Sequence, residues 1–163
     1  MPSAVIGDLD SLSDQSAKLF ADVLHHVPEQ ETVDFEKAIT RVDAPLICAV
    51  GFSGGRLDHM LAVLDVMGRH AERPIVLVGP DDAAAVVPQG GVHLTEVEIG
   101  ITLSVMPLAK VMVQATGLRW DINDKVMEPL GFASPSNEVI SSDLSLSADG
   151  PVLLILPRSH LPQ

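Results

Sequence analysis

Two aspartates, Asp8 and Asp10, directly follow the apolar run 4–7, which is typical of a buried strand. Ligands of α/β proteins bind at the carboxyl ends of parallel strands, and carboxylates at i and i+2 there can chelate a hard cation such as Mg²⁺. The alternative is a polar turn in which Asp10 and Ser11 cap the next helix. Because D-x-D sequences are common, the motif alone favours the turn.

A second acidic segment, EQETVD at residues 29–34, precedes a helix-like stretch. It places Gln30 and Asp34 near each other in the chain, among further acids. Acids at a helix start often only complement the helix dipole, so this segment alone is a weak sign of a site. We expect Thr32 or Asp34 to cap the helix.

A third segment, GGRLDH, begins at Gly54. Gly54 and Gly55 let the backbone approach a ligand, and the following helix directs its free N–H groups there. Arg56 offers a planar fork suited to a phosphate. Asp58 and His59 could hold Arg56, bind a metal or cap the helix, and a plain crossover loop with a solvated arginine is the alternative. The spacing matches neither the P-loop nor the dinucleotide fingerprint.

The second half of the chain carries two further candidates. Trp120, the only tryptophan, stands beside a turn in TGLRW. A single tryptophan usually packs in a core, but it can also stack on a heteroaromatic or cationic ring. Ser136 and Asn137 belong to a polar SPSN segment, which either forms a simple turn or supplies hydroxyl and amide hydrogen bonds.

The first half must position the first three segments. Apolar runs alternate there with helix-like stretches, and this order predicts a parallel sheet. The expected strands are 4–7, 46–51 with Cys48 buried, and 75–79, which Pro80-Asp81-Asp82 ends. The expected helices are about 13–20, about 34–42 and a stretch after Gly55 with Leu57, Leu61, Leu64 and Met67 on one face, while 24–27 either extends the first helix or forms a strand.

Beyond about residue 90 the sequence consists of short β-rich stretches between turns, which predicts an antiparallel sandwich or a barrel-like unit. A cluster of Pro, Asp and Gly residues near 80–92 indicates the boundary. We therefore expect an α/β domain over residues 1–85 and an all-β domain over residues 86–163.

Composition limits the possible partners. The 163 residues are 47% hydrophobic and carry a formal net charge of −12, which disfavours nucleic acid and anionic membranes. A phosphorylated ligand would need a few placed cations, helix N–H groups or metal ions to offset its charge. No apolar run is long enough to span a bilayer, and the single cysteine suits a reducing cytoplasm.

Taken in order, these segments resemble the thiamine pyrophosphokinase family. The matching segments are IGDLDS at 6–11, EQETVDFEKA at 29–38, GGRLDH at 54–59, GLRW at 117–120 and SPSN at 134–137. Each is short, but five in the family's order across nearly the whole chain make a specific match.

The resemblance implies an α/β nucleotide-binding domain joined to a β-sandwich that binds thiamine, assembled as a homodimer. It implies pyrophosphoryl transfer from ATP to thiamine, giving thiamine diphosphate and AMP with Mg²⁺. Mg²⁺ would then be held by three acids, while the Gly54–His59 segment receives ATP phosphates. The three acids are Asp8, Asp10 and Asp34.

The same resemblance assigns the remaining roles. Asp58 would orient Arg56 or help to remove the proton of the thiamine hydroxyl. Trp120 would stack on thiamine, with Ser136 and Asn137 at the same cleft, contributed across the dimer, and Gln30 touching the substrate. On this interpretation the carboxylates and Arg56 converge at one end of a parallel sheet.

The chain departs from the family pattern at three places. Family members begin with a strand, a glycine-containing loop and an A-D-G-G-like segment before I-G-D. This chain starts at Met1, just ahead of I-G-D, so we expect that strand and part of the nucleotide pocket to be missing. In addition, E-Q-E replaces D-Q-D, and Val33 replaces a threonine.

Two other functions stay open. A truncated relative could keep the fold and weak ligand binding without catalysis. VIGDLDSL could also be the nucleophile strand of an aspartate-dependent phosphatase. That class needs a downstream lysine and a further acidic pair, whereas Lys110 and Lys125 fall in the β-rich half and Asp81-Asp82 is the only acidic pair of interest.

Overall fold

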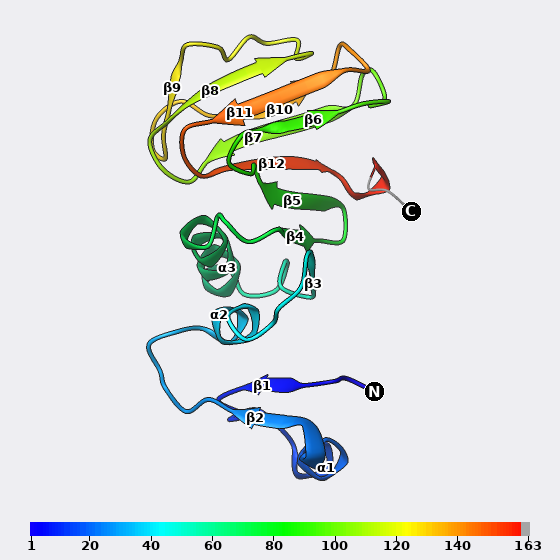
Figure 1. The fold of residues 1–163 in the computed structure, drawn as a ribbon, viewed down its shortest axis with the longest axis vertical. Helices are drawn as coiled ribbons and strands as arrows, with labels where there is room; N and C mark the ends of the chain where they lie inside the picture. Colours follow the sequence, from blue (N-terminus) through cyan, green and yellow to red (C-terminus); the bar gives the residue numbers. More distant parts are fainter. Residues whose placement is uncertain (161–163) are drawn as a thin grey trace. The chain divides into compact units, whose positions relative to one another are not determined.

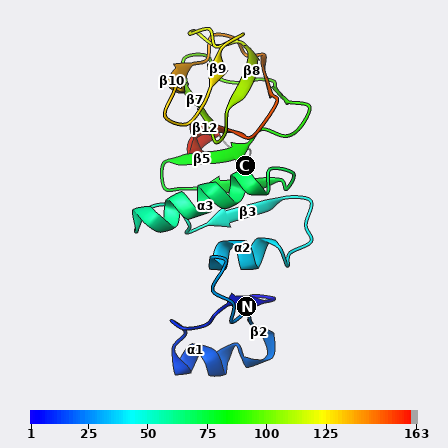
Figure 2. The same cartoon turned by 90° about the vertical axis from the view of Figure 1, so that its left-hand side faces the viewer.

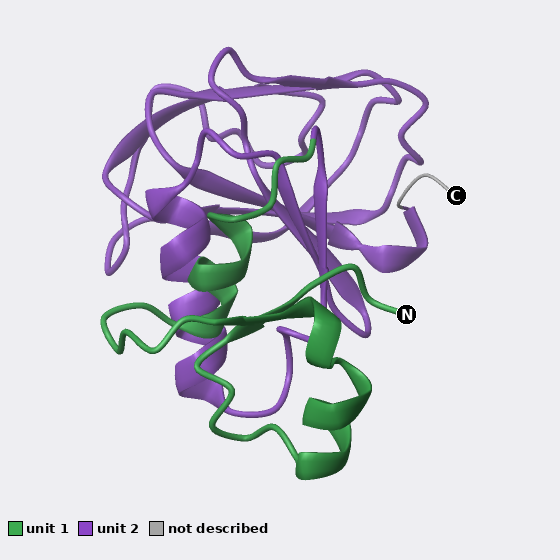
Figure 3. Cartoon of the chain, turned by 60° about the horizontal axis from the view of Figure 1, so that its bottom comes forward, with its two compact units in different colours: residues 1–44 green, residues 45–163 purple. Residues whose placement is uncertain are grey.

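The computed structural model describes residues 1–160, and the chain divides into two compact units (Figure 3). The first unit is Met1–Ala44 and the second begins at Pro45. Strands make up most of the regular structure, and helices are few. Within residues 1–160, no helix combines the length and the apolar character needed to cross a bilayer.

The first unit is small and contains one parallel strand pair. Its elements are β1 (Val5–Gly7), α1 (Asp14–Leu19), the 3₁₀ turn η1 (Ala21–Val23), β2 (Leu24–His26) and α2 (Asp34–Ile39). β1 and β2 pair in parallel, with Val5 opposite Leu24, so residues 24–26 of the ambiguous segment 24–27 form a strand. The expected caps of α2 are wrong, because Val33 occupies the cap position and no side chain caps it.

The second unit holds the remaining elements (Figure 1). They are β3 (Ile47–Val50), α3 (Leu57–Arg69), β4 (Ile75–Val78), β5 (Asp82–Val86), β6 (Val92–Leu94), β7 (Thr102–Pro107), β8 (Val111–Thr116), β9 (Val126–Met127), β10 (Ser134–Glu138), β11 (Leu144–Ala148), β12 (Val152–Pro157) and the 3₁₀ turn η2 (Arg158–His160).

A six-stranded sheet joins strands from both halves of the sequence, in the order β10-β7-β12-β5-β4-β3. β3 and β4 pair in parallel, as expected, whereas β5 runs antiparallel to both β4 and β12. The reversal follows from the turn after β4, where the Gly79 N–H donates to the carbonyl of Asp82 at 2.8 Å. Pro80-Asp81-Asp82 thus leads directly into β5, and β5 joins the parallel pair β3–β4 to the antiparallel strands in one sheet.

A four-stranded sheet, β6-β11-β8-β9, faces the β7–β12 part of the larger sheet across one apolar core. β8 alternates buried and exposed residues along its whole length, which is the pattern of a strand with one covered face. Val105, Val113 and Leu146 come from three different strands and are at most 1% exposed. This core packs the two sheets against each other.

α3 lies along β4 and β5, as Figures 1 and 2 both show. Val63, Val66 and Met67 face inward, whereas Leu57 and Leu61 are 68% and 56% exposed, so the expected apolar face is only partly buried. The expected burial of Cys48 is wrong: it is exposed on β3, where the neighbouring Ala49 is buried instead.

Candidate functional site

In the first unit, the carboxylates of Asp8 and Asp34 lie together at the end of β1. The backbone N–H of Asp8 donates to Asp34 Oδ1 at 3.3 Å, and that of Asp10 donates to Asp8 Oδ1 at 3.1 Å. Leu9, between the two aspartates, has a φ of 62° and lies in the left-handed region. The structure therefore brings Asp8 and Asp34 together.

Lys37, one turn into α2, contacts both carboxylates. Its Nζ lies 3.4 Å from Asp34 Oδ1 and 3.7 Å from Asp8 Oδ2, and its side chain is only 2% exposed. The sequence interpretation missed this residue. The signal that could have found it is its i, i+3 spacing from Asp34, which places the two side chains on the same face of a helix.

Hydrogen bonds lower the pKa of the Asp8 carboxyl below its ordinary value. The largest cause is the Asp10 N–H, followed by the Gln30 amide and the charge of Lys37. Gln30 therefore lies close enough to Asp8 to affect its pKa. The pKa of Glu29 is also lowered, mainly by its hydrogen bond from the Thr32 hydroxyl. The Glu29 carboxylate is therefore engaged within its own loop.

The donor set of the first unit fits a hard divalent cation that is shared with a phosphorylated ligand. Mg²⁺ in such sites takes one or two carboxylates and completes its shell with water and phosphate oxygens. Asp34 is 57% exposed and Asp8 23%, so water and a ligand can reach them. Over residues 1–160, no group of three acidic, His or Cys side chains is arranged to hold a metal by itself.

Gly7 keeps the space that Asp34 occupies. A Cβ on Gly7 would lie 3.0 Å from Asp34 Oδ1 and 3.1 Å from its Cγ, which is closer than such contacts allow without a shift. Glycine therefore lets the end of β1 pack against this carboxylate without displacing it.

In the second unit, the turn before α3 holds a bidentate ion pair. Gly54 and Gly55 have φ values of 77° and 74°, so both need the left-handed conformation that glycine adopts freely. Arg56 Nε and Nη2 donate to Asp58 Oδ1 and Oδ2 at 3.1 and 2.5 Å. Asp58 Oδ1 also accepts the backbone N–H of His59 at 3.0 Å.

This pairing strongly affects the electrostatics of the turn. The pKa of Asp58 is lowered to about 2, chiefly by the hydrogen bond from Arg56, and the pKa of Arg56 is raised by the same contact. Both side chains remain exposed, at 73% for Arg56 and 62% for Asp58. Of the expected roles for Asp58, orienting Arg56 matches these contacts, whereas Arg56 occupies the cap position of α3 and no side chain caps it.

A pocket of 240 Å³ opens beside Gly54, between α3 and the six-stranded sheet. Its lining is mainly apolar: Ser53, Gly54, Met60, Leu64, Leu77, Gly79, Pro80, Asp81, Asp82, Ala84, Leu153 and Ile155. Within residues 1–160 the Ser53 hydroxyl is buried and makes no hydrogen bond. It packs against Gly79, where an added Cβ would lie 2.9 Å from it.

Trp120 and Asn137 form a second constellation in this unit. Asn137 is 1% exposed, and its side chain binds both backbone polar groups of Trp120. Its amide nitrogen also donates to Ser134 Oγ at 2.9 Å. Ser136 has a φ of 54°, and its N–H donates to Ser104 Oγ at 3.0 Å. The tryptophan turn and the SPSN segment are thus in contact within one chain.

The Trp120 ring is available rather than packed in the core. The residue is 55% exposed, and the guanidinium of Arg119 lies 5.9 Å from the ring centroid. Glu138 holds that guanidinium at 2.6 Å. The ring therefore already attracts a cation, which is the behaviour expected of a stacking platform.

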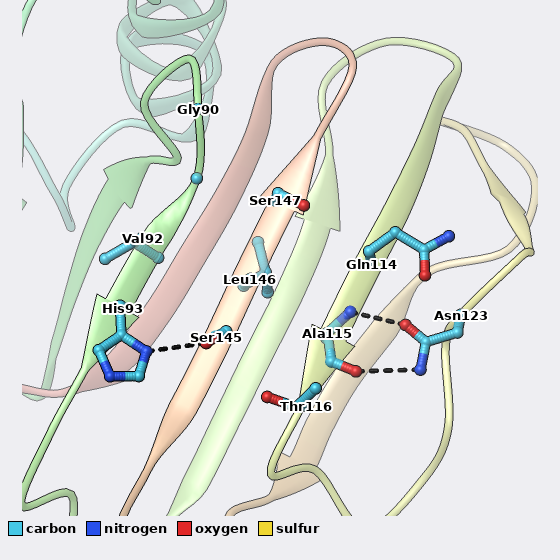
Figure 4. Close-up of a pocket in the computed structure, with 11 residues that line it drawn as sticks. Gly90, Val92, His93, Gln114, Ala115, Thr116, Asn123, Ser145, Leu146 and Ser147 are labelled. Atoms are coloured by element: carbon cyan, nitrogen blue, oxygen red, sulfur yellow. Dashed lines mark hydrogen bonds between the residues drawn. The ribbon is translucent and has the colours of Figure 1, made fainter.

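Another hollow, of 440 Å³, lies over the four-stranded sheet and contains none of the predicted site residues (Figure 4). His93 Nδ1 contacts Ser145 Oγ there at 2.8 Å, and His93 Nε2 lies 3.0 Å from Asp143 Oδ1. Because His93 and Ser145 are direct cross-strand partners, strand pairing accounts for their contact.

Two family models match the chain. One describes the catalytic domain of thiamin pyrophosphokinase and matches residues 1–77, and the other describes its vitamin B1 binding domain and matches residues 92–153. Between them they cover most of the chain, and the five segments quoted above fall within them.

Curated relatives give the same result. Thiamine pyrophosphokinase 1 from Arabidopsis thaliana is 27% identical over 172 residues, and its namesake from Oryza sativa subsp. japonica is 25% identical over 170 residues. Each match covers 93% of this chain but only 64% of the plant protein. The chain thus spans less than two thirds of the length of these relatives.

Solved structures share the fold. Thiamin pyrophosphokinase from Candida albicans superposes with a TM-score of 0.78 at 15% identity, covering 96% of this chain and 73% of that one. The enzyme from Geobacillus thermodenitrificans gives a TM-score of 0.76 at 24% identity, covering 96% and 77%.

Proposed function

Because the chain belongs to the thiamine pyrophosphokinase family, we propose that it transfers the pyrophosphoryl group of ATP to thiamine, giving thiamine diphosphate and AMP. The observation that carries the proposal is that one chain matches both the catalytic and the vitamin B1 binding models of that family. Charge stabilisation and positioning, rather than covalent chemistry by the protein, are the main demands of such a reaction.

The acids of the first unit are proposed to bind Mg²⁺ together with ATP. Asp8 and Asp34 carry this role, since their carboxylates lie together and are open to solvent, and Asp10 adds its backbone N–H to Asp8. When bound, Mg²⁺ offsets phosphate charge and polarises the phosphoryl oxygens. Gln30, which acts on Asp8, is proposed to touch the acceptor substrate.

The turn before α3 is proposed to receive phosphate oxygens. Gly54 and Gly55 keep side chains away from the turn, α3 begins there, and Arg56 supplies the cation. His59 lies in the first turn of α3, where its own N–H is donated to Asp58 Oδ1. Asp58 keeps the guanidinium fork in one orientation, and its low pKa leaves it a poor general base at neutral pH. We therefore assign Asp58 to positioning Arg56 rather than to removing the thiamine proton.

The acceptor is proposed to stack on Trp120. Thiamine carries a cationic thiazolium ring, and an exposed indole held by a buried amide is suited to such a ring. Asn137 would act on thiamine through the Trp120 backbone, because its own side chain is buried and satisfied. Ser136, at its left-handed position, would present its hydroxyl to the substrate.

The proposal also covers the domain division, the oligomeric state and the location of the protein. We retain residues 1–85 as the nucleotide-binding α/β domain and residues 86–163 as the thiamine-binding β-sandwich, a boundary that the two family matches flank. We also propose a homodimer, and a cytoplasmic location on the ground of the single cysteine.

Purified protein incubated with ATP, Mg²⁺ and thiamine tests the proposal. We expect equal amounts of AMP and thiamine diphosphate by chromatography, and loss of both with Asp34→Ala and with Arg56→Ala. Thiamine binding without turnover would instead identify a non-catalytic relative. Release of phosphate from simple monoesters would indicate a phosphatase.

A further inference from the structure

Lys37 is buried although both its ionic partners reach solvent. Its side chain is 2% exposed, against 57% for Asp34 and 23% for Asp8. The ammonium therefore lies deeper than the two carboxylates, and its contact with Asp34 is to Oδ1 at 3.4 Å. The Lys37 ammonium thus lies beneath the two carboxylates that are proposed to hold Mg²⁺.

This lysine is not explained by stability. Removing an ammonium from water is costly, and an ion pair seldom repays that cost in full. A methionine would fill a similar volume without the cost. The two carboxylates also reach solvent, so they do not need Lys37 to neutralise buried negative charge. The charge of Lys37 must therefore matter for what binds at Asp8 and Asp34.

We propose that Lys37 is a positioning residue that makes metal binding at Asp8 and Asp34 depend on the triphosphate. With Lys37 present, the cluster carries one net negative charge instead of two, so a free divalent cation is held weakly. A cation that arrives with ATP gains from the same ammonium, because Lys37 attracts the phosphates. This inference rests on the proposed function. It adds that the cation binds well only together with the nucleotide.

Electron paramagnetic resonance of Mn²⁺, titrated with and without ATP in the absence of thiamine, separates the two effects without measuring turnover. In Lys37→Met we expect free Mn²⁺ to bind about tenfold more tightly and Mn²⁺–ATP about tenfold more weakly. Lys37→Arg, which keeps the charge, should leave both affinities within about threefold of the parent. Lys110→Met removes one exposed lysine from the second unit and should change neither.

The opposite signs make the outcomes decisive. If Lys37→Met weakens both affinities, or changes neither, the lysine has a structural role and the inference fails. Lys37→Gln repeats the test if the methionine variant does not fold, and failure of both neutral variants to fold also overturns the inference. If the parent protein binds Mn²⁺ but not Mn²⁺–ATP, the proposed function fails, and the inference that rests on it fails too. If the parent binds both but Lys37→Met shows no opposite shifts, the inference alone fails.

Discussion

The Asn137 side chain pairs with the Trp120 backbone like a neighbouring strand: its Oδ1 accepts the Trp120 N–H at 3.1 Å and its Nδ2 donates to the Trp120 carbonyl at 2.8 Å. A buried amide thereby fixes the peptide that carries an exposed indole. The position of the ring is thus set from inside the protein, while its face is left for a ligand.

Asn137→Ala should cost both stability and thiamine affinity. It leaves buried donors and acceptors of Trp120 and Ser134 without partners, so we expect the free energy of unfolding to fall by about 2–3 kcal/mol in urea titrations. Asn123→Ala is the matched control. Asn123 Oδ1 accepts the Ala115 N–H at 2.7 Å and its Nδ2 donates to the Ala115 carbonyl at 3.0 Å, which is the arrangement that Asn137 makes with Trp120. The control should lose stability but keep thiamine affinity, and equal thiamine affinities in the two variants would refute the role of Asn137.

Trp120→Ala should weaken thiamine binding with little effect on folding. The residue is 55% exposed, so we expect the melting temperature to be retained and the thiamine dissociation constant to rise about tenfold, as for loss of a cation–π contact. Trp120→Phe should keep part of the affinity. Since Trp120 is the only tryptophan, thiamine should quench the intrinsic fluorescence of the parent protein, and unchanged emission at saturating thiamine would rule out stacking.

The Arg56–Asp58 pair should persist through the whole neutral and mildly acidic range. The pKa of Asp58 in the folded protein is about 2, which is below the unfolded value, so the pair stabilises the fold at higher pH and is lost only as the pH falls through about 2. Carbon NMR should show no titration of the Asp58 carboxyl from neutral pH down to about pH 3. In Arg56→Ala its midpoint should return toward about 4, and a midpoint near 4 in the parent protein would be inconsistent with the ion pair.

Gly7→Ala should impair the acidic cluster more than the fold. The added Cβ would press on Asp34 Oδ1 at 3.0 Å and displace the carboxylate from Asp8 and Lys37. We expect pyrophosphoryl transfer to fall at least about tenfold, consistent with misplacement of a binding group. Gly68→Ala is the control, because its Cβ would lie equally close, at 3.0 Å, to Cδ1 of Leu108, whose side chain is outside the proposed site. Similar activities of the two variants would count against the assigned role of Asp34.

Local structure was largely predictable from the sequence. The apolar runs that became β1, β3 and β4 are strands, and the glycine-rich turn does precede a helix. The family resemblance implied that Trp120 and the SPSN segment share a cleft, and within this chain Asn137 of that segment contacts the Trp120 backbone. These features depend on short-range pattern and on family resemblance, which the sequence carries directly.

What the sequence did not reveal depends on pairing between distant strands. The sequence predicts that Asp82 ends a strand, but Asp82 begins β5. The turn at Gly79 reverses the chain, so that β5 pairs antiparallel with β4 and with β12. Cys48 was predicted to be buried because apolar runs are usually buried, but it lies on the exposed side of β3. Lys37 was missed because lysine is normally a surface residue, and its burial arises from the packing of α2 on β1.

The most direct test of the account is phosphorus NMR of a reaction mixture that contains the protein, ATP, Mg²⁺ and thiamine. Transfer of an intact pyrophosphoryl group predicts that the ATP signals are replaced by those of AMP and of the diphosphate of thiamine, in equal amounts and with no ADP. Accumulation of ADP with thiamine monophosphate, or of inorganic phosphate alone, would contradict it.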